Sequence, residues 1–127
     1  MKNVVVDMHN MLFADAIART LSEFNSDIQV YVSEDPGKTE ELCLGASSNV
    51  LIMDVTSYMP WRIEERLSLR GNIKKELPDC KIVFVVDENS ESELADRVRM
   101  AMKEKLIDNF IYGSVSSAYL SAVIDTL

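Results

Sequence analysis

The chain has 127 residues, a length typical of one domain, and 47% of them are hydrophobic, which excludes intrinsic disorder. Acidic residues outnumber basic ones by 21 to 13, and the net charge of −8 argues against direct nucleic-acid binding, which needs clustered lysines and arginines. The apolar runs are strand-sized, far shorter than the ~18 residues of a membrane span, and no signal peptide is visible. A cytoplasmic protein without membrane contact is therefore expected.

The first half of the chain alternates runs of β-branched residues with segments of helical periodicity. Between residues 13 and 24, large apolar side chains recur at helical spacing, which is typical of a helix with one buried face. A proline at position 36 suits the first turn of a shorter helix. The pattern predicts a strand over 3–7, a helix over 13–24, a strand over 27–32, a helix over 36–44 and a strand over 49–54.

The second half continues this alternation. The segment 81–86 is an unbroken apolar run, as expected of a strand that is buried on both faces. Glu91 and Glu93 lie favourably near the start of the next helix. The pattern predicts a helix over 60–77, a strand over 81–86, a helix over 92–106, a strand over 109–112 and a helix over 116–127.

Alternating strands and helices predict an α/β domain with a parallel sheet, because parallel strands need crossover helices. No repeat or long linker interrupts the pattern, so residues 1–127 are predicted to form a single domain. Cys43 and Cys80 have neither metal-site spacing nor a disulfide-rich context, and the only histidine is His9. Zinc chemistry and Ser-His-Asp catalysis are therefore poorly supported.

Ligands of open parallel sheets bind beyond the carboxyl ends of the strands. Asp7 closes the first predicted strand, and Asp54 closes the third. Two carboxylates can ligate Mg²⁺, and an aspartate in such a place can also accept a phosphoryl group. Alternatively, each side chain only caps the turn that follows its strand.

Four segments of the chain resemble the receiver domains of response regulators: 3–12, 50–54, 78–83 and 109–112. They resemble the family's first strand and helix start, its phosphoacceptor strand, the approach to its fourth strand, and its fifth strand. The resemblance implies a flavodoxin-like (CheY-like), doubly wound, five-stranded parallel sheet of order 2-1-3-4-5 with helices on both faces. In that order the first and third strands are neighbours, which brings Asp7 and Asp54 together.

The resemblance also implies roles for individual residues. Asp54 matches the phosphoacceptor, and Asp7, Asp54 and Thr56 match the metal-binding positions. Phe110 matches a switch aromatic, or it is an ordinary buried strand residue. Three positions lack the family's chemistry: Met8 replaces a second acid, Val86 a serine or threonine, and Gly113 a lysine. Without the lysine, the added charge of roughly −2 on a phosphorylated aspartate has no fixed cation beside it.

Other residues have plainer interpretations. Asp87 and Ser114 could lend a carboxylate and a hydroxyl, but both residue types are common in turns. Trp61 fits either a packed lid on the third helix or a partner surface. The basic residues of two predicted helices are interleaved with acids and are expected on solvated faces: Arg62, Arg66, Arg70, Lys74, Lys75, Arg97, Arg99, Lys103 and Lys105. Three methionines are expected in the core: Met53, Met100 and Met102.

The sequence therefore predicts a degenerate receiver, or pseudo-receiver, which is not an enzyme and acts through protein contacts. Phosphorylation of Asp54 is expected to be weak or lost, and Mg²⁺ to bind weakly at most. The expected partner is a sensor kinase or another signalling protein, and homodimerisation is expected through the fourth helix, fifth strand and fifth helix, roughly residues 92–127.

Two alternatives stay open. One is a phosphorylatable two-component receiver of unusual construction. The other is a small flavodoxin-like protein that binds flavin or a nucleotide, although the first loop, 7–12, has no glycine to form a phosphate cradle. The sequence is compatible with a stand-alone domain and with a fragment of a longer regulator.

Overall fold

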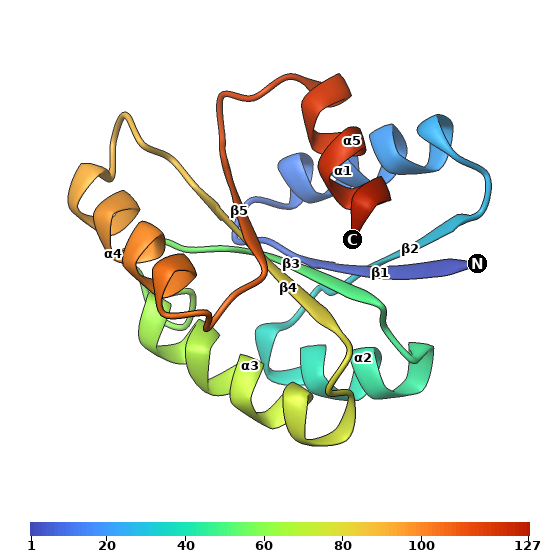
Figure 1. The fold of residues 1–127 in the computed structure, drawn as a ribbon, viewed down its shortest axis with the longest axis horizontal. Coiled ribbons are helices and arrows are strands. Elements are labelled where there is room, and N and C mark those ends of the chain that lie inside the picture. Colours follow the sequence, from blue (N-terminus) through green and yellow to red (C-terminus); the bar gives the residue numbers. More distant parts are fainter.

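The computed structural model describes residues 1–127 and contains one five-stranded parallel sheet (Figure 1). The strands are β1 (Lys2–Asp7), β2 (Ile28–Val32), β3 (Val50–Asp54), β4 (Lys81–Val86) and β5 (Asn109–Tyr112). Their order is β2-β1-β3-β4-β5, which confirms the predicted doubly wound topology. The central strand β3 is buried along its whole length, since helices cover both of its faces.

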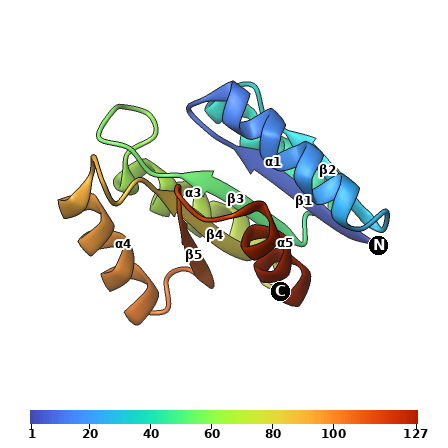
Figure 2. The same ribbon diagram turned by 90° about the horizontal axis from the view of Figure 1, so that it is seen from above.

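Helices cover the two faces of the sheet (Figure 2). On one face lie α1 (Met11–Phe24) and α5 (Ser117–Thr126), and on the other lie α2 (Thr39–Ala46), α3 (Ile63–Glu76) and α4 (Ser92–Lys103). A 3₁₀ turn, Pro36–Lys38, precedes α2, so the helix expected over 36–44 is split in two. No helix combines the length and hydrophobicity that a bilayer span requires.

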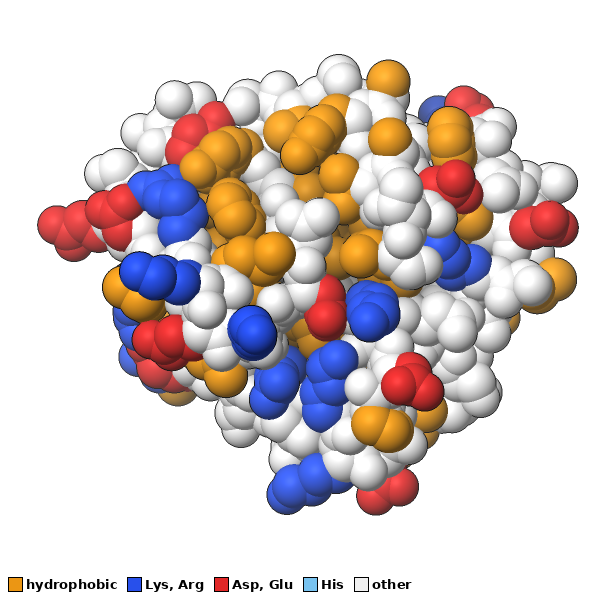
Figure 3. All heavy atoms as spheres, viewed as in Figure 1, with side chains coloured by type: hydrophobic (Ala, Val, Ile, Leu, Met, Phe, Trp, Pro, Cys, Tyr) orange, Lys and Arg blue, Asp and Glu red, His pale blue; other side chains and the backbone are white.

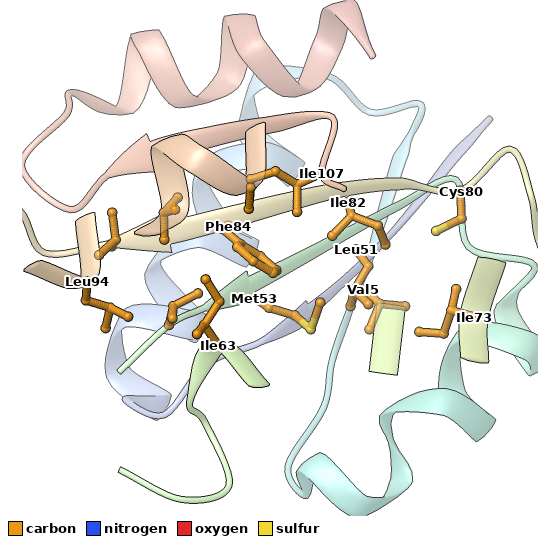
Figure 4. Close-up of a cluster of buried hydrophobic side chains, with 14 of the residues drawn as sticks. Val5, Leu51, Met53, Ile63, Ile73, Cys80, Ile82, Phe84, Leu94 and Ile107 are labelled. Carbon is orange, nitrogen blue, oxygen red and sulfur yellow. The ribbon is translucent and has the colours of Figure 1, made fainter. Parts of the chain in front are cut away.

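Each face of the sheet packs against its own apolar core. Alternate residues of a strand point to opposite faces, so Val4 and Val6 belong to the core under α1 and α5, and Val5 to the core under α2, α3 and α4. Figure 4 shows the second core, in which Phe84 and Met53 of adjacent strands pack together. By the same alternation, Asp7 faces α2 and α3.

The helix predicted over 60–77 begins later, at Ile63. The backbone N–H of Thr56 donates to the carbonyl of Trp61 (2.8 Å), and the N–H of Trp61 donates to the carbonyl of Tyr58 (2.8 Å). These bonds hold the residues before the helix in a compact loop, and Arg62 is extended, with φ −74° and ψ 161°. Trp61 therefore belongs to the β3–α3 loop and not to a helix.

The helix predicted over 92–106 ends earlier, at Lys103. Lys105 adopts a left-handed conformation with φ 62°, and the N–H of Leu106 donates to the carbonyl of Ala101 (2.9 Å). This geometry satisfies carbonyl groups at the helix end and stops the helix. The sequence pattern predicted a longer helix because Lys105 has the same helical spacing as the buried residues.

One of the three methionines expected in the core lies outside it. Met53 is fully buried and Met102 is half-buried, but Met100 is 52% exposed. The buried stripe of α4 runs through Leu94, Val98 and Ala101, and position 100 points away from it.

Candidate functional site

The structure places Asp7 and Asp54 at the carboxyl edge of two adjacent strands. β1 pairs with β3 in parallel, and Asp7 lies opposite Met53, one residue before Asp54. Both side chains are removed from water, with residue exposures of 1% for Asp7 and 9% for Asp54. Burying two carboxylates so close together is costly unless a cation and hydrogen-bond donors accompany them.

The cation is Arg66 of α3. Its guanidinium donates from Nη1 to Asp7 Oδ2 (2.7 Å) and from Nη2 to Asp54 Oδ1 (2.8 Å). The same side chain also binds two backbone carbonyls, from Nε to Asp54 O (2.8 Å) and from Nη2 to Asp7 O (2.9 Å). With an exposure of 1%, Arg66 is among the largest fully buried side chains in the chain.

The expectation that Arg66 lies on a solvated helix face is therefore wrong. Interleaving with acids describes Arg62 and Arg97, which pair with glutamates near the surface. Arg66 instead follows Ile63 by three positions and precedes Ile73 by seven, so helical geometry turns all three toward the sheet. That spacing is the part of the signal in the sequence that places Arg66 on the buried face of the helix.

Two hydroxyl groups extend the site toward α2. Thr39 donates from Oγ1 to Asp7 Oδ2 (2.7 Å), and its hydroxyl also lies 2.7 Å from Ser33 Oγ. All three residues are buried. Asp7 Oδ2 therefore accepts from both Arg66 and Thr39, which links the end of β1 to the start of α2 and to α3. Sequence patterns gave no indication of this contact, because a threonine at a helix start is common.

The second oxygen of Asp54 is also engaged. Asp54 Oδ2 accepts from the backbone N–H of His9 (2.9 Å) in the β1–α1 loop. Burial raises the pKa of Asp54 above its usual value, and nearby Asp7 adds to that rise, while Arg66 and the His9 N–H oppose it. The pKa of Asp54 is therefore raised despite the contact with Arg66.

The three positions that lack receiver chemistry are occupied by groups without a charge or a hydroxyl. Met8 is 3% exposed and packs in the core under α1 and α5, and Val86 is 1% exposed in the opposite core. Gly113 is exposed, and its N–H donates to the carbonyl of Val86 (2.9 Å).

The neighbours that could compensate act as turn residues. Asp87 Oδ2 accepts from Ser90 Oγ (2.8 Å), and its Oδ1 accepts from the backbone N–H of Asn89 (3.0 Å). These hydrogen bonds, that of Ser90 foremost, lower the pKa of the exposed Asp87. Ser114 donates its hydroxyl to Glu88 Oε1 (2.5 Å). The β4–α4 loop and the β5–α5 loop are thus held by their own side chains.

An open hollow of about 530 Å³ lies beside Asp54 and is lined by the loops after β1, β3, β4 and β5. The rings of His9 and Trp61 pack with centroids 4.3 Å apart at its rim, and Tyr58 is 63% exposed. Trp61 is half-buried, so its role as a packed lid on the third helix or as part of a partner surface stays a prediction. Phe110 is half-buried in β5 and meets Tyr112 edge-on at 5.5 Å.

The side chains around Asp54 offer a divalent cation few ligands. No group of three His, Cys, Asp or Glu residues is arranged to hold a metal ion, and Met8 offers no oxygen where a second acid would stand. The hydroxyl of Thr56 is used within its own loop, where it accepts from the N–H of Tyr58 (3.1 Å). Weak Mg²⁺ binding through Asp7, Asp54 and Thr56 stays a prediction.

Comparison with solved structures identifies what this fold resembles. A response-regulator receiver domain from Clostridium thermocellum matches with a TM-score of 0.78 at 18% identity, over 99% of this chain and 93% of that one. The REC domain of AraT, a response regulator from Geobacillus stearothermophilus, matches with a TM-score of 0.74 at 21% identity, over 98% and 91%.

A CheY-like receiver domain protein from Methanospirillum hungatei has a TM-score of 0.71 at 16% identity, over 99% of this chain and 92% of that one. No protein-family model and no curated sequence matches the chain. With the strand order, the helices on both faces and the full-length matches in hand, the chain has the CheY-like fold of response-regulator receiver domains.

Proposed function

We propose that this chain is a receiver-like signalling domain that acts through protein contacts and depends little on phosphorylation of Asp54. The observation that carries the proposal is the engagement of both Asp54 oxygens, one by the buried guanidinium of Arg66 and the other by the N–H of His9. A nucleophilic carboxylate must present an oxygen lone pair to the phosphoryl group, and each of these contacts engages one lone pair and makes its oxygen less nucleophilic.

Charge supports the same proposal. Phosphorylation adds roughly −2 at neutral pH and needs nearby donors or cations to be stabilised. Arg66 already serves two carboxylates, and Gly113 and Val86 offer neither an ammonium nor a hydroxyl group. The acids Asp87 and Glu91, which also line the hollow, would repel the added charge.

The proposed contact surface for partner proteins is the face formed by α4, β5 and α5. β5 is an edge strand of the sheet and carries the half-buried Phe110 and Tyr112, and Tyr119 of α5 is exposed. Figure 3 shows apolar side chains gathered on the side of the molecule where these elements lie. A second copy of the chain or another signalling protein is the proposed occupant.

The test is incubation of the protein with Mg²⁺ and either acetyl phosphate or beryllofluoride, followed by intact-mass measurement and circular dichroism. We expect no stoichiometric modification of the native chain and no difference from Asp54→Asn. Stoichiometric labelling that disappears in Asp54→Asn and is accompanied by a conformational response would overturn the proposal in favour of a phosphorylatable receiver. Sedimentation at high concentration tests the homodimer, which a monomer would exclude.

The phosphorylatable receiver is kept as a second candidate because of one observation. Asp54 borders the open hollow of about 530 Å³, and its side chain retains 13% exposure, so a small phosphodonor has a route to it. The labelling experiment separates the two candidates directly.

A further inference from the structure

The guanidinium of Arg66 is held from several directions at once. Its Nη1 and Nη2 bind one carboxylate oxygen each of Asp7 and Asp54, at 2.7 and 2.8 Å. Nε and Nη2 additionally bind the main-chain carbonyls of Asp54 and Asp7, at 2.8 and 2.9 Å. A planar, permanently charged group with donors on both edges is suited to bridge two carboxylates in this way.

A divalent cation at the same edge of the sheet would need the same two carboxylates. Mg²⁺ binds carboxylate oxygens at about 2.0–2.1 Å and demands nearly octahedral geometry. Asp7 Oδ2 and Asp54 Oδ1 both accept from Arg66. An ion bound by these two carboxylates would lie close to the guanidinium, and their like charges would repel strongly at that distance.

We propose that Arg66 is a built-in counter-ion that takes the place of a divalent cation between Asp7 and Asp54. The native chain then binds no Mg²⁺ or Mn²⁺ at this edge, and removing the guanidinium opens a divalent-cation site made of the two carboxylates. This inference deepens the proposed function and rests on it for the choice of site.

Burial makes the replacement permanent. Arg66 has an exposure of 1%, and its hydrogen bonds join α3 to β1 and β3, so the guanidinium cannot swing out to solvent without breaking all four of them. A mobile surface arginine would leave the acids free for an ion part of the time. Arg66 does not have that freedom.

The experiment is a Mn²⁺ titration of the full chain. Binding is measured by calorimetry and by the electron paramagnetic resonance signal of the Mn²⁺ that stays free. Three proteins are compared: the native chain, Arg66→Met, and the matched control Arg62→Met, which removes a guanidinium from the same helix region that pairs only with Glu65 at the surface. Fluorescence of the single tryptophan gives a further readout, because Trp61 packs on His9, whose N–H binds Asp54.

We expect no saturable Mn²⁺ binding to the native chain or to Arg62→Met. In Arg66→Met the loss of one positive charge within contact distance should produce saturable Mn²⁺ binding, at least about tenfold tighter than the weakest affinity the titration can detect, and Asp54→Asn in that background should abolish it. Saturable binding to the native chain that Asp54→Asn abolishes would overturn the inference, and so would a folded Arg66→Met protein that takes up no Mn²⁺.

Circular dichroism establishes whether Arg66→Met is folded, and Arg66→Gln is the second variant because it retains a donor for one carbonyl. If neither variant folds, the native-chain titration alone decides, since saturable binding overturns the inference and its absence upholds it. The proposed function and this inference can fail independently. Phosphorylation of Asp54 without metal would overturn the proposed function but would leave the role of Arg66 as a counter-ion standing.

Discussion

Arg66 brings one positive charge to a pair of buried carboxylates. The guanidinium donates to Asp7 and Asp54, and the N–H of His9 supplies Asp54 with a further donor. Burial still dominates at Asp54 and raises its pKa. The direction of this shift means that folding favours the protonated form of Asp54.

This raised pKa predicts the sign of a pH dependence. Folded Asp54 keeps its proton at pH values where the unfolded chain, with a pKa of about 3.9, has lost it. The contribution of Asp54 to the free energy of unfolding should thus be greatest below about pH 3.9 and fall as the pH rises toward the raised pKa of the folded state. Urea unfolding of the native chain and Asp54→Asn across this window measures the contribution as the difference between the two.

Asp87 provides a control, because its contribution to the free energy of unfolding should change with pH in the opposite direction to that of Asp54. Its pKa is lowered by the hydroxyl of Ser90 and by backbone N–H groups, so its contribution is present above the unfolded pKa and is lost as the pH falls through the folded value. The difference between the native chain and Asp87→Asn should rise with pH. A difference for Asp54→Asn that also rises would show that Arg66 outweighs burial.

At the scale of elements, α3 docks on the sheet through an ion pair as well as through apolar side chains. Its fully buried residues are Ile63, Arg66 and Ile73. The middle member of this stripe makes polar contacts to both β1 and β3, which an aliphatic residue could not make. The position of α3 therefore depends on charges contributed by residues far away in the sequence.

A double-mutant cycle on Arg66→Met and Asp7→Asn tests this dependence. Arg66→Met alone should destabilise the fold by about 3–5 kcal/mol, because it leaves two buried carboxylates without a cation. The coupling free energy with Asp7→Asn should fall within about 0.5–3 kcal/mol. Chemical denaturation monitored by circular dichroism gives all four free energies of unfolding.

The exposed pair at the start of the same helix serves as the comparison. Arg62 donates to both oxygens of Glu65, at 2.8 and 2.9 Å, but the two side chains are 40% and 27% exposed. Solvent screening should limit the coupling between Arg62→Met and Glu65→Gln to about 0.2–1 kcal/mol. Equal couplings for the two pairs would contradict a special role for Arg66 in docking α3.

The elements themselves follow from local patterns, and the site only in part. The strands could be predicted because their apolar runs are short and continuous, and the rule for open sheets directed attention to Asp7 and Asp54 at the strand ends. The ends of the helices were harder to predict from the sequence. The start of α3 depends on the backbone hydrogen bond between Thr56 and Trp61, and the end of α4 depends on the left-handed conformation of Lys105.

Arg66 was missed for a different physical reason. Its two carboxylate partners are 59 and 12 residues away, so their contact exists only after β1, β3 and α3 have come together. Local charge alternation cannot distinguish a buried guanidinium from a solvated one. Only the combination of helical spacing with two strand-end acids at the same edge contains that information.

At the scale of the whole molecule, the departures from receiver chemistry meet at one edge of the sheet. Met8, Val86 and Gly113 follow or close three different strands, and Arg66 comes from the face of α3 that points to the same place. Gly113 has room for a side chain, since an added Cβ would lie 3.9 Å from the nearest atom, the carbonyl oxygen of Val86. A larger side chain, such as a lysine, is therefore sterically feasible at position 113.

If Arg66 takes the place of the cation, adding the acid, hydroxyl and lysine typical of receivers should not be enough for Mg²⁺ binding until Arg66 is also removed. A triple variant with Met8→Asp, Val86→Thr and Gly113→Lys keeps Arg66 between the acids, and we expect Mg²⁺ to leave its melting temperature unchanged and acetyl phosphate to leave Asp54 unlabelled. Adding Arg66→Met should free the carboxylates, so that Mg²⁺ raises the melting temperature by an amount equivalent to about 2.7 kcal/mol at a hundredfold excess over the dissociation constant.

In the quadruple variant, acetyl phosphate should then label Asp54 in a Mg²⁺-dependent reaction, because the ion balances the acids and the new lysine faces the phosphoryl group. Intact-mass measurement gives the extent of labelling, and Asp54→Asn in the same background is the control. Equal labelling of the triple and quadruple variants would mean that Arg66 yields to the ion unaided, and that only the absent second acid, hydroxyl and ammonium groups separate this chain from a phosphorylated receiver.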